Sequence, residues 1–246
     1  MGIEHIIHQI WLGNNPRPVE WMQTVEDFAT EYGYKYMIWT EDAISSSLMK
    51  KELAKVFKGY ESLAGKADIL RLAVLYKYGG VYIDADTVIM RPEKFDTFIK
   101  KNTANVFFGW ENINAKRTRK LGLAQKKLVA NGLIGAEKGH PFLKELLDGI
   151  TDNIQENGAD GEAWKEVGPL YVTQKYTELK SKYKDINIYP MKYFYPMHWA
   201  GITDPELHKS VKIPAASMLF QYGYSTNSFD KIFKKLRRRT RRRRQD

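Results

Sequence analysis

Residues 66–92 read KADILRLAVLYKYGGVYIDADTVIMRP, and this stretch decides the fold of the chain. Its first half places apolar residues at helical spacing and predicts a helix with one broad buried face. Gly79 and Gly80 are expected to end that helix, because glycine takes the left-handed conformation at a helix end without strain. A short apolar strand, VYI, follows and leads directly to the carboxylates of Asp84 and Asp86.

The two aspartates are one residue apart at the end of this strand. Side chains two positions apart share a face of an extended strand, so Asp84 and Asp86 are expected to converge if the backbone stays extended. Two carboxylates at one point are unfavourable unless a cation lies between them, and oxygen ligands suit Mn²⁺ or Mg²⁺. On its own the pattern is short, and an ordinary solvated turn after a strand is the commoner explanation.

The composition of the whole chain predicts a folded α/β protein. Of its 246 residues, 43% are hydrophobic and 13% aromatic, which excludes a disordered class for most of the chain. The absence of cysteine excludes disulfides and thiolate chemistry. Strands expected at 5–11 and 34–39 alternate with helices expected at 19–31 and 49–58, which favours an open sheet. Glycine-rich dinucleotide and P-loop motifs are absent from the sequence.

The 66–92 block as a whole resembles the Asp-x-Asp block of glycosyltransferase family 32, the group of Och1-like and capsular polysaccharide sugar transferases. The family pattern is matched here by Ala67, Asp68, Arg71, Leu75, Tyr76, Gly79, Gly80, Tyr82, Asp84 and Asp86. The large clostridial toxin glucosyltransferases are more distantly similar through the same block. The resemblance implies a glycosyltransferase A type fold, which is a Rossmann-like open mixed sheet flanked by helices.

The resemblance also implies roles for single residues. Asp68 and Arg71 would reach the donor sugar, although residues three apart on a helix could equally form a surface ion pair of little consequence. Asn131 would contact the sugar near the reaction centre, and these three residues are the candidate catalytic group. Trp11 would stack on the nucleotide base from a loop at Gly13; the alternative is a core tryptophan at the end of a strand.

The last block of the family matches less well. Relatives carry a histidine followed by Ser-Trp, whereas this chain has Gln221 and then Ser228-Phe229. Ser228 is the candidate donor-binding residue of this block. The third metal ligand, beside Asp84 and Asp86, stays open between Gln221, His198 and neither. His8, alone in an apolar strand, is expected to be structural.

The basic charge of the chain is concentrated at its end. The formal net charge is +10, and residues 234–246 carry nine basic residues and one acidic residue. We expect residues 1–227 to form one catalytic domain and residues 228–246 a basic amphipathic tail. Such a tail suits an anionic membrane surface through residues 228–244, with nucleic-acid binding the less favoured alternative and a solvated tail the third. Without a recognisable signal peptide or membrane span, a cytoplasmic protein at the inner face of a membrane is expected.

Together these features predict a metal-dependent glycosyltransferase. A UDP- or GDP-sugar, bound with Mn²⁺ or Mg²⁺, would donate its sugar to a glycan or lipid-linked acceptor, with retention of configuration as in family members. The alternative is a degenerate transferase fold that only docks on a membrane or nucleic acid. Residues 112–127 are polar and basic, and we expect either a lid or acceptor segment or an ordinary solvated loop.

Overall fold

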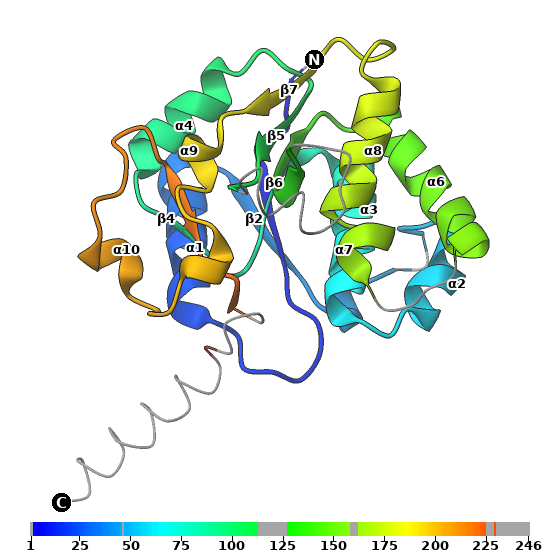
Figure 1. Ribbon diagram of the computed structural model, residues 1–246, viewed down its shortest axis with the longest axis horizontal. Helices are drawn as coiled ribbons and strands as arrows, with labels where there is room; N and C mark the ends of the chain where they lie inside the picture. Colours follow the sequence, from blue (N-terminus) through cyan, green and yellow to red (C-terminus); the bar gives the residue numbers. More distant parts are fainter. Residues whose placement is uncertain (1, 46, 113–126, 158–161, 225–228, 230–246) are drawn as a thin grey trace, which may run out of the picture.

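A six-stranded mixed sheet runs through the middle of the protein (Figure 1). Its strands are β1 (Ile6–Ile10), β2 (Lys35–Trp39), β3 (Gly80–Ile83), β5 (Val106–Trp110), β6 (Val129–Ala136) and β7 (Ile186–Tyr189). Their order across the sheet is β2-β1-β3-β6-β5-β7.

The computed structural model describes residues 2–45, 47–112, 127–157, 162–224 and 229. Most of the expected 112–127 loop and nearly all of the basic tail, Ser228 included, therefore lie outside the described residues.

The strand directions bring several strand ends to one edge of the sheet. β1 is parallel to β2 and β3, and β5 is parallel to β7. β6 is antiparallel to both β3 and β5. The carboxyl ends of β1, β3 and β5 therefore meet the amino end of β6, at the edge where open α/β sheets bind their ligands. The expected open α/β sheet is confirmed.

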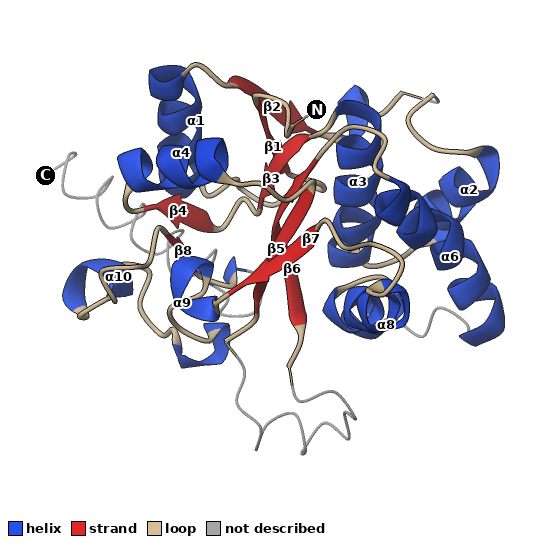
Figure 2. Ribbon diagram, turned by 90° about the horizontal axis from the view of Figure 1, so that it is seen from above, coloured by secondary structure: helices blue, strands red, loops and turns tan. Residues whose placement is uncertain are grey.

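Helices cover both faces of the sheet (Figure 2). One face carries α1 (Val19–Tyr32) and α4 (Pro92–Lys101), and the other carries α2 (Lys51–Gly59), α3 (Leu63–Tyr78), α6 (Pro141–Asn157) and α8 (Pro169–Leu179). Short helical segments complete the fold: η1 (Glu41–Ala43), α7 (Ala163–Glu166), α9 (Met191–Phe194), η2 (Trp199–Gly201) and α10 (Leu207–Ser210). Within the described residues, no helix is long and apolar enough to cross a bilayer.

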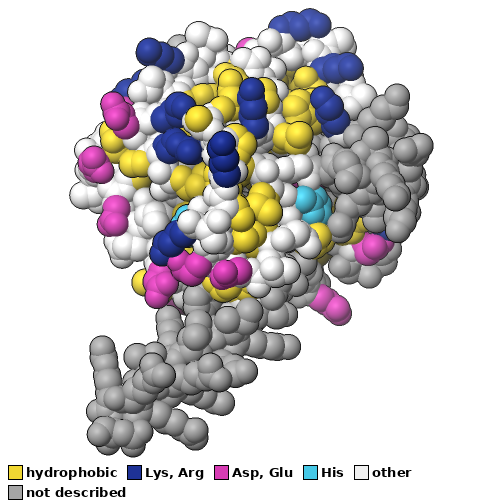
Figure 3. Space-filling model, turned by 60° about the vertical axis from the view of Figure 1, so that its left-hand side comes forward, with side chains coloured by type: hydrophobic (Ala, Val, Ile, Leu, Met, Phe, Trp, Pro, Cys, Tyr) yellow, Lys and Arg dark blue, Asp and Glu magenta, His cyan; other side chains and the backbone are white. Residues whose placement is uncertain are grey.

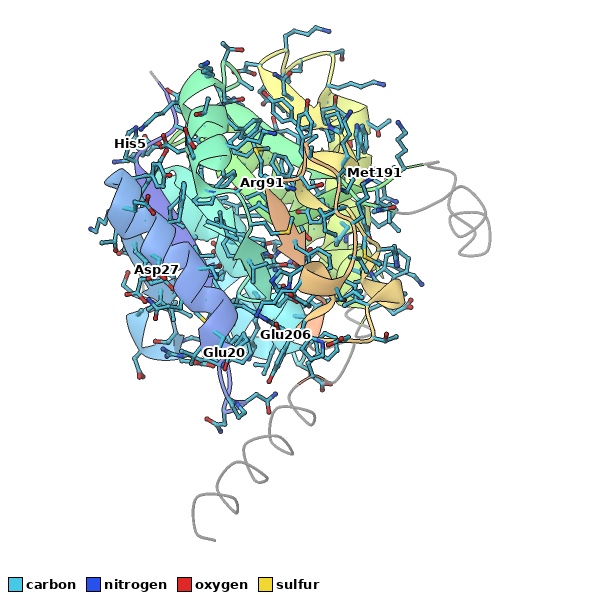
Figure 4. The ribbon with its side chains drawn as sticks, turned by 90° about the vertical axis from the view of Figure 1, so that its left-hand side faces the viewer. His5, Glu20, Asp27, Arg91, Met191 and Glu206 are labelled. Atoms are coloured by element: carbon cyan, nitrogen blue, oxygen red, sulfur yellow. The ribbon has the colours of Figure 1, made fainter. Side chains whose placement is uncertain are left out.

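A two-stranded sheet lies beside the main one. β4 (Thr87–Ile89) pairs antiparallel with β8 (Leu219–Gln221), so a late segment of the chain is brought next to the Asp-x-Asp stretch. Its apolar side packs on α1, where Trp21 stacks on Tyr222 with ring centroids 4.1 Å apart. Figure 4 shows this side of the molecule, with Glu20 and Asp27 on α1.

Helix α3 departs from the expected pattern. The sequence suggested one buried face, but every residue from Asp68 to Leu75 is buried, so that expectation is wrong. The helix lies between the sheet and α6, and it therefore has apolar neighbours on both sides. The helix begins at Ser62, whose hydroxyl accepts a hydrogen bond from the Gly65 N–H. Burial on all sides matters because Asp68 and Arg71 lie within this stretch.

The glycine pair after α3 makes a sharp turn into β3. Gly79 and Gly80 have φ angles of 67° and 98°, which favour glycine. A Cβ atom on Gly80 would lie 2.4 Å from the carbonyl oxygen of Ile6 on β1. The expected glycine stop is confirmed, and the second glycine is also needed because β1 approaches so closely.

The folded body is mixed in charge on the face seen in Figure 3. Lys and Arg side chains lie across the upper part of this face among hydrophobic ones, while several Asp and Glu side chains gather along its lower rim. This agrees with a sequence whose excess of basic residues lies in residues 234–246.

Candidate active site

Asp84 and Asp86 lie at the sheet edge, but their backbone is not extended. β3 ends at Ile83, and the Asp84 N–H still donates to the Gly132 carbonyl at 2.8 Å. The chain then turns, with the Thr87 N–H donating to the Asp84 carbonyl at 3.1 Å. The prediction that an extended strand aligns the two carboxylates is therefore wrong. A tight turn brings them together instead.

Gln221, at the end of β8, joins the two carboxylates. Its Nε2 donates to Asp84 Oδ2 at 2.7 Å and to Asp86 Oδ1 at 3.2 Å. The other oxygen of Asp86 accepts from the Tyr224 N–H at 2.8 Å. Gly132 leaves room for this arrangement, since a Cβ there would lie 2.6 Å from Asp84 Oδ2. Of the two residues considered as third ligand, Gln221 thus contacts both aspartates.

Arg71 connects the turn to helix α3 and strand β6. Its Nη1 lies 3.1 Å from Asp84 Oδ1 and its Nη2 lies 3.1 Å from Asp68 Oδ1. Nη1 also donates to the Asn131 carbonyl at 2.6 Å, and Asn131 Nδ2 donates to Asp68 Oδ1 at 2.8 Å. Asp68, Arg71 and Asn131 are only 6–7% exposed. The alternative of a surface ion pair is thereby excluded.

Two carboxylates pair with the Arg71 guanidinium, and a third, that of Asp86, is linked to Asp84 through Gln221. Burial raises the pKa of Asp68 to about 6, although Arg71 opposes the rise. Burial and the neighbouring Asp84 raise the pKa of Asp86 to about 6. Burial disfavours the charge of Arg71, but Asp84 and other neighbours outweigh it and raise its pKa above the usual range. Carboxylates whose ionised form is disfavoured in this way gain from an added cation.

Two cavities meet at Asp84. The first, which we call the Trp11 cavity, has a volume of about 340 Å³ and is lined by residues that include Trp11, Arg71, Tyr82, Asp86 and Tyr224. The second, the Glu111 cavity, has a volume of about 130 Å³ and is lined by residues that include Glu111, Asn131, Tyr195, His198, Trp199 and Gln221. Asp84 lines both, so ligands in the two cavities would meet beside its carboxylate.

The remaining candidate residues fall at different distances from this centre. Trp11 is partly exposed in its cavity, edge-on to Tyr224 with centroids 5.9 Å apart, and its Nε1 donates to the Asn15 carbonyl at 2.9 Å. Gly13 is not among the residues lining the Trp11 cavity, and its N–H donates to Glu41 Oε1 at 2.6 Å. His198 lies 3.8 Å from Glu111 in the Glu111 cavity rather than on the two aspartates.

His8 is structural, as expected. One ring nitrogen lies 2.8 Å from the Gly79 carbonyl, and the other accepts from Trp39 Nε1 at 3.1 Å. Burial lowers its pKa to about 4, so the ring is neutral at physiological pH.

Some residues of the site were not singled out from the sequence. The Tyr82 hydroxyl donates to Asp84 Oδ1 at 2.6 Å, and its position two residues before Asp84 on the strand could have indicated this. Tyr224 and Glu111 carry no such signal, because only the pairing of distant strands brings them to the site.

The donor set fits a divalent cation. Among the residues that the structure describes, no three His, Cys, Asp or Glu side chains are grouped to hold a metal. Asp84, Asp86 and the amide of Gln221 converge instead, and all three carry oxygen ligands of the kind that Mn²⁺ and Mg²⁺ accept. Such an ion would complete its coordination with ligand phosphates and water.

Comparison with solved structures identifies the fold. A structure described as "PaToxG Glycosyltransferase" matches with a TM-score of 0.53 at 21% identity, over 73% of this chain and 72% of that one. The ligand-free glycosyltransferase domain from the YGT toxin matches with a TM-score of 0.52 at 9% identity, over 87% of each chain. The fold is the glycosyltransferase A type, as the sequence predicted.

Part of the sequence matches a known protein family. Residues 18–105, which contain α3 and the Asp-x-Asp turn, match the family described as "Glycosyltransferase sugar-binding region containing DXD motif". Inositol phosphoceramide mannosyltransferase 1 of Schizosaccharomyces pombe is 24% identical over 196 residues, 76% of this chain and 56% of that protein. The chain thus spans about half the length of this curated relative. The expected resemblance to Asp-x-Asp glycosyltransferases is confirmed.

Proposed function

We propose that the protein is a glycosyltransferase that moves a sugar from a UDP- or GDP-sugar to a hydroxyl of a glycan or lipid-linked acceptor. The observation that carries this proposal is the partly buried cluster of Arg71, Asp84, Asp86 and Gln221 between two cavities at the sheet edge. The match of residues 18–105 and the names of the relatives support it. The basic residues 234–246 would suit an acceptor in an anionic membrane surface.

Each group of the site has a proposed task. The Trp11 cavity holds the nucleotide, with Trp11 against the base. Asp84, Asp86 and Gln221 hold Mn²⁺ or Mg²⁺, which when bound neutralises charge on the diphosphate. Asp68 and Asn131 position the donor sugar. Arg71 keeps the carboxylates of Asp68 and Asp84 in place.

The proposed reaction forms one bond and breaks one. The acceptor hydroxyl oxygen bonds to the anomeric carbon, the bond from that carbon to the diphosphate oxygen breaks, and its electron pair leaves with the diphosphate. The hydroxyl proton passes to the leaving diphosphate oxygen. We propose attack on the leaving-group face, which retains configuration, because Asp68 and Asp84 are both engaged by Arg71 and are poorly placed as nucleophiles.

The proposal is tested with a panel of UDP- and GDP-sugars in the presence of Mn²⁺. With the active donor, Asp86→Ala is expected to lower kcat/KM by about a hundredfold or more, since a charged ligand of the cation is lost. Asp27→Ala, an exposed carboxylate on α1, is the matched control and should retain the wild-type rate.

Two results would contradict the proposal. Equal rates for Asp86→Ala and the wild type would remove the metal role. Calorimetry that finds no Mn²⁺-dependent binding of UDP or GDP would remove the donor site, whereas binding of the nucleotide without transfer from any donor would favour the degenerate binding module.

A further inference from the structure

The Glu111 cavity shares Asp84 with the Trp11 cavity but is otherwise built from different elements. Besides Asp84, its lining comes from the residues after β5, the start of β6, the start of α8, the segment 195–199 and Gln221 at the end of β8. With about 130 Å³ it is smaller than the roughly 300–1,000 Å³ of pockets that hold a drug-sized ligand. It therefore has room for one ring of a ligand rather than for a nucleotide.

Glu111 is held rigidly at the wall of this cavity. It is the first residue after β5, and its N–H donates to the Leu128 carbonyl at 2.9 Å. Its Oε1 accepts from Trp199 Nε1 at 3.3 Å and lies 3.8 Å from His198 Nε2. The Ala200 N–H donates to His198 Nδ1 at 3.0 Å, which orients the histidine ring with Nε2 toward Glu111.

Tyr195 supplies an independent sign of a ligand. It is 6% exposed and lines the cavity beside Asp84. Among the described residues its hydroxyl has no hydrogen-bond partner within normal geometry, although the Leu133 backbone lies nearby. A buried hydroxyl without a good partner is unfavourable, so this atom marks a position where a ligand hydroxyl would bind.

The chemistry of the lining indicates the kind of ligand. The aromatic rings of Tyr195 and Trp199 offer apolar faces, while the Glu111 carboxylate and the Tyr195 hydroxyl offer hydrogen-bonding groups. A ligand ring with C–H faces and several hydroxyl groups would pack on the aromatic faces and bond to the hydrogen-bonding groups. We propose that the Glu111 cavity binds the hydroxylated ring of the acceptor, a sugar or a cyclitol, and that Tyr195 and Glu111 select it through its hydroxyls. This inference rests on the proposed function and names its acceptor class.

The test uses methyl α-mannoside, methyl β-galactoside and myo-inositol as acceptors, which separates a sugar ring from a cyclitol. Tyr195→Phe is expected to raise the acceptor KM about fivefold, and Glu111→Gln about tenfold or more, because a lost bond to a charged group costs more. The Kd for UDP or GDP with Mn²⁺ should change by less than about twofold in both variants, since the nucleotide lies in the other cavity. Tyr193→Phe, two residues earlier in α9 and outside the cavity lining, is the matched control.

Unchanged acceptor KM values in both variants would overturn the inference, as would a parallel loss of nucleotide affinity. If the wild type transfers sugar from no donor, the proposed function fails, and saturation-transfer NMR with the same three compounds tests the cavity separately. Binding to the wild type that is lost in Glu111→Gln would then support the cavity, and no binding of any of the three would overturn it. Near-UV circular dichroism confirms that each variant is folded.

Discussion

Gln221 shows how one residue can join two others into a site. Its amide nitrogen donates hydrogen bonds to Asp84 Oδ2 at 2.7 Å and to Asp86 Oδ1 at 3.2 Å. An amide carries two donors on nitrogen and an acceptor oxygen, so the same side chain can hold two carboxylates together or contribute an oxygen ligand. In the sequence Gln221 departed from the family pattern. In the structure its amide nitrogen lies between the two aspartates and donates to both.

His8 gives a pH-dependent prediction at the same scale. Its pKa is lowered to about 4 in the folded protein from 6.5, so the unfolded chain binds more protons between these values. Its contribution to stability is present above pH 6.5 and is lost as the pH falls toward 4. Compared with His8→Gln, the wild type should therefore lose up to about 3 kcal/mol of unfolding free energy across this range.

Urea denaturation of both proteins at several pH values measures this difference. Asp68 and Asp86 have raised pKa values, so they favour the folded state on acidification, but they are present in both proteins and cancel in the comparison. A difference in unfolding free energy that stays constant with pH would show that His8 does not titrate as described.

At the scale of elements, α3 and the turn after it carry the site. The spacing of three between Asp68 and Arg71 puts both on neighbouring positions of the helix. Burial of the helix on all sides then removes them from water, so that they pair with Asp84 and Asn131 instead. The Gly79-Gly80 turn sets the distance between this helix and β3.

Two glycines provide a matched test of that turn. Gly80→Ala introduces a Cβ 2.4 Å from the Ile6 carbonyl at a φ of 98°, whereas Gly33→Ala, at a φ of 75°, meets nothing within 4 Å. We expect Gly33→Ala to cost about 1 kcal/mol of unfolding free energy and Gly80→Ala at least about 3 kcal/mol. Chemical denaturation compares them, and equal costs would mean that β1 yields to the new side chain.

At the scale of the whole molecule, the pairing of β4 with β8 completes the site. It brings Gln221 and the Tyr224 backbone, about 135 residues away in the sequence, onto Asp84 and Asp86. The apolar cluster around Trp21 holds this small sheet against α1. The proposed metal site therefore depends on β8, a strand that lies outside the family-matched region 18–105.

A second matched pair tests this dependence. Phe220 in β8 and Phe142 in α6 are both fully buried, and neither lines the two cavities. Replacing either with leucine should cost about 1 kcal/mol of stability. Only Phe220→Leu should also weaken Mn²⁺-dependent binding of UDP or GDP in calorimetry, because it disturbs the strand that carries Gln221. Equal affinities in the two variants would separate the site from the small sheet.

The sequence by itself determined the local features of this protein. Periodicity and turn residues predicted the alternation of strands and helices, the glycine stop and the structural role of His8. The family resemblance of the 66–92 block named Asp68, Arg71, Asp84 and Asp86 as candidate site residues, and the structure brings these four together. These features are readable because they depend on neighbours within a few positions along the chain, where helix and strand geometry is constant.

Only the tertiary structure decided how those residues meet. It showed a turn instead of an extended strand at Asp84–Asp86 and buried residues 68–75 of α3 on every side. It also brought in Tyr195, Gln221 and Tyr224 from the last part of the chain. It also showed that the site has two cavities, which share Asp84 in their lining. Such contacts depend on strand order and on packing between distant segments. The spacing of residues along the chain predicts neither of these.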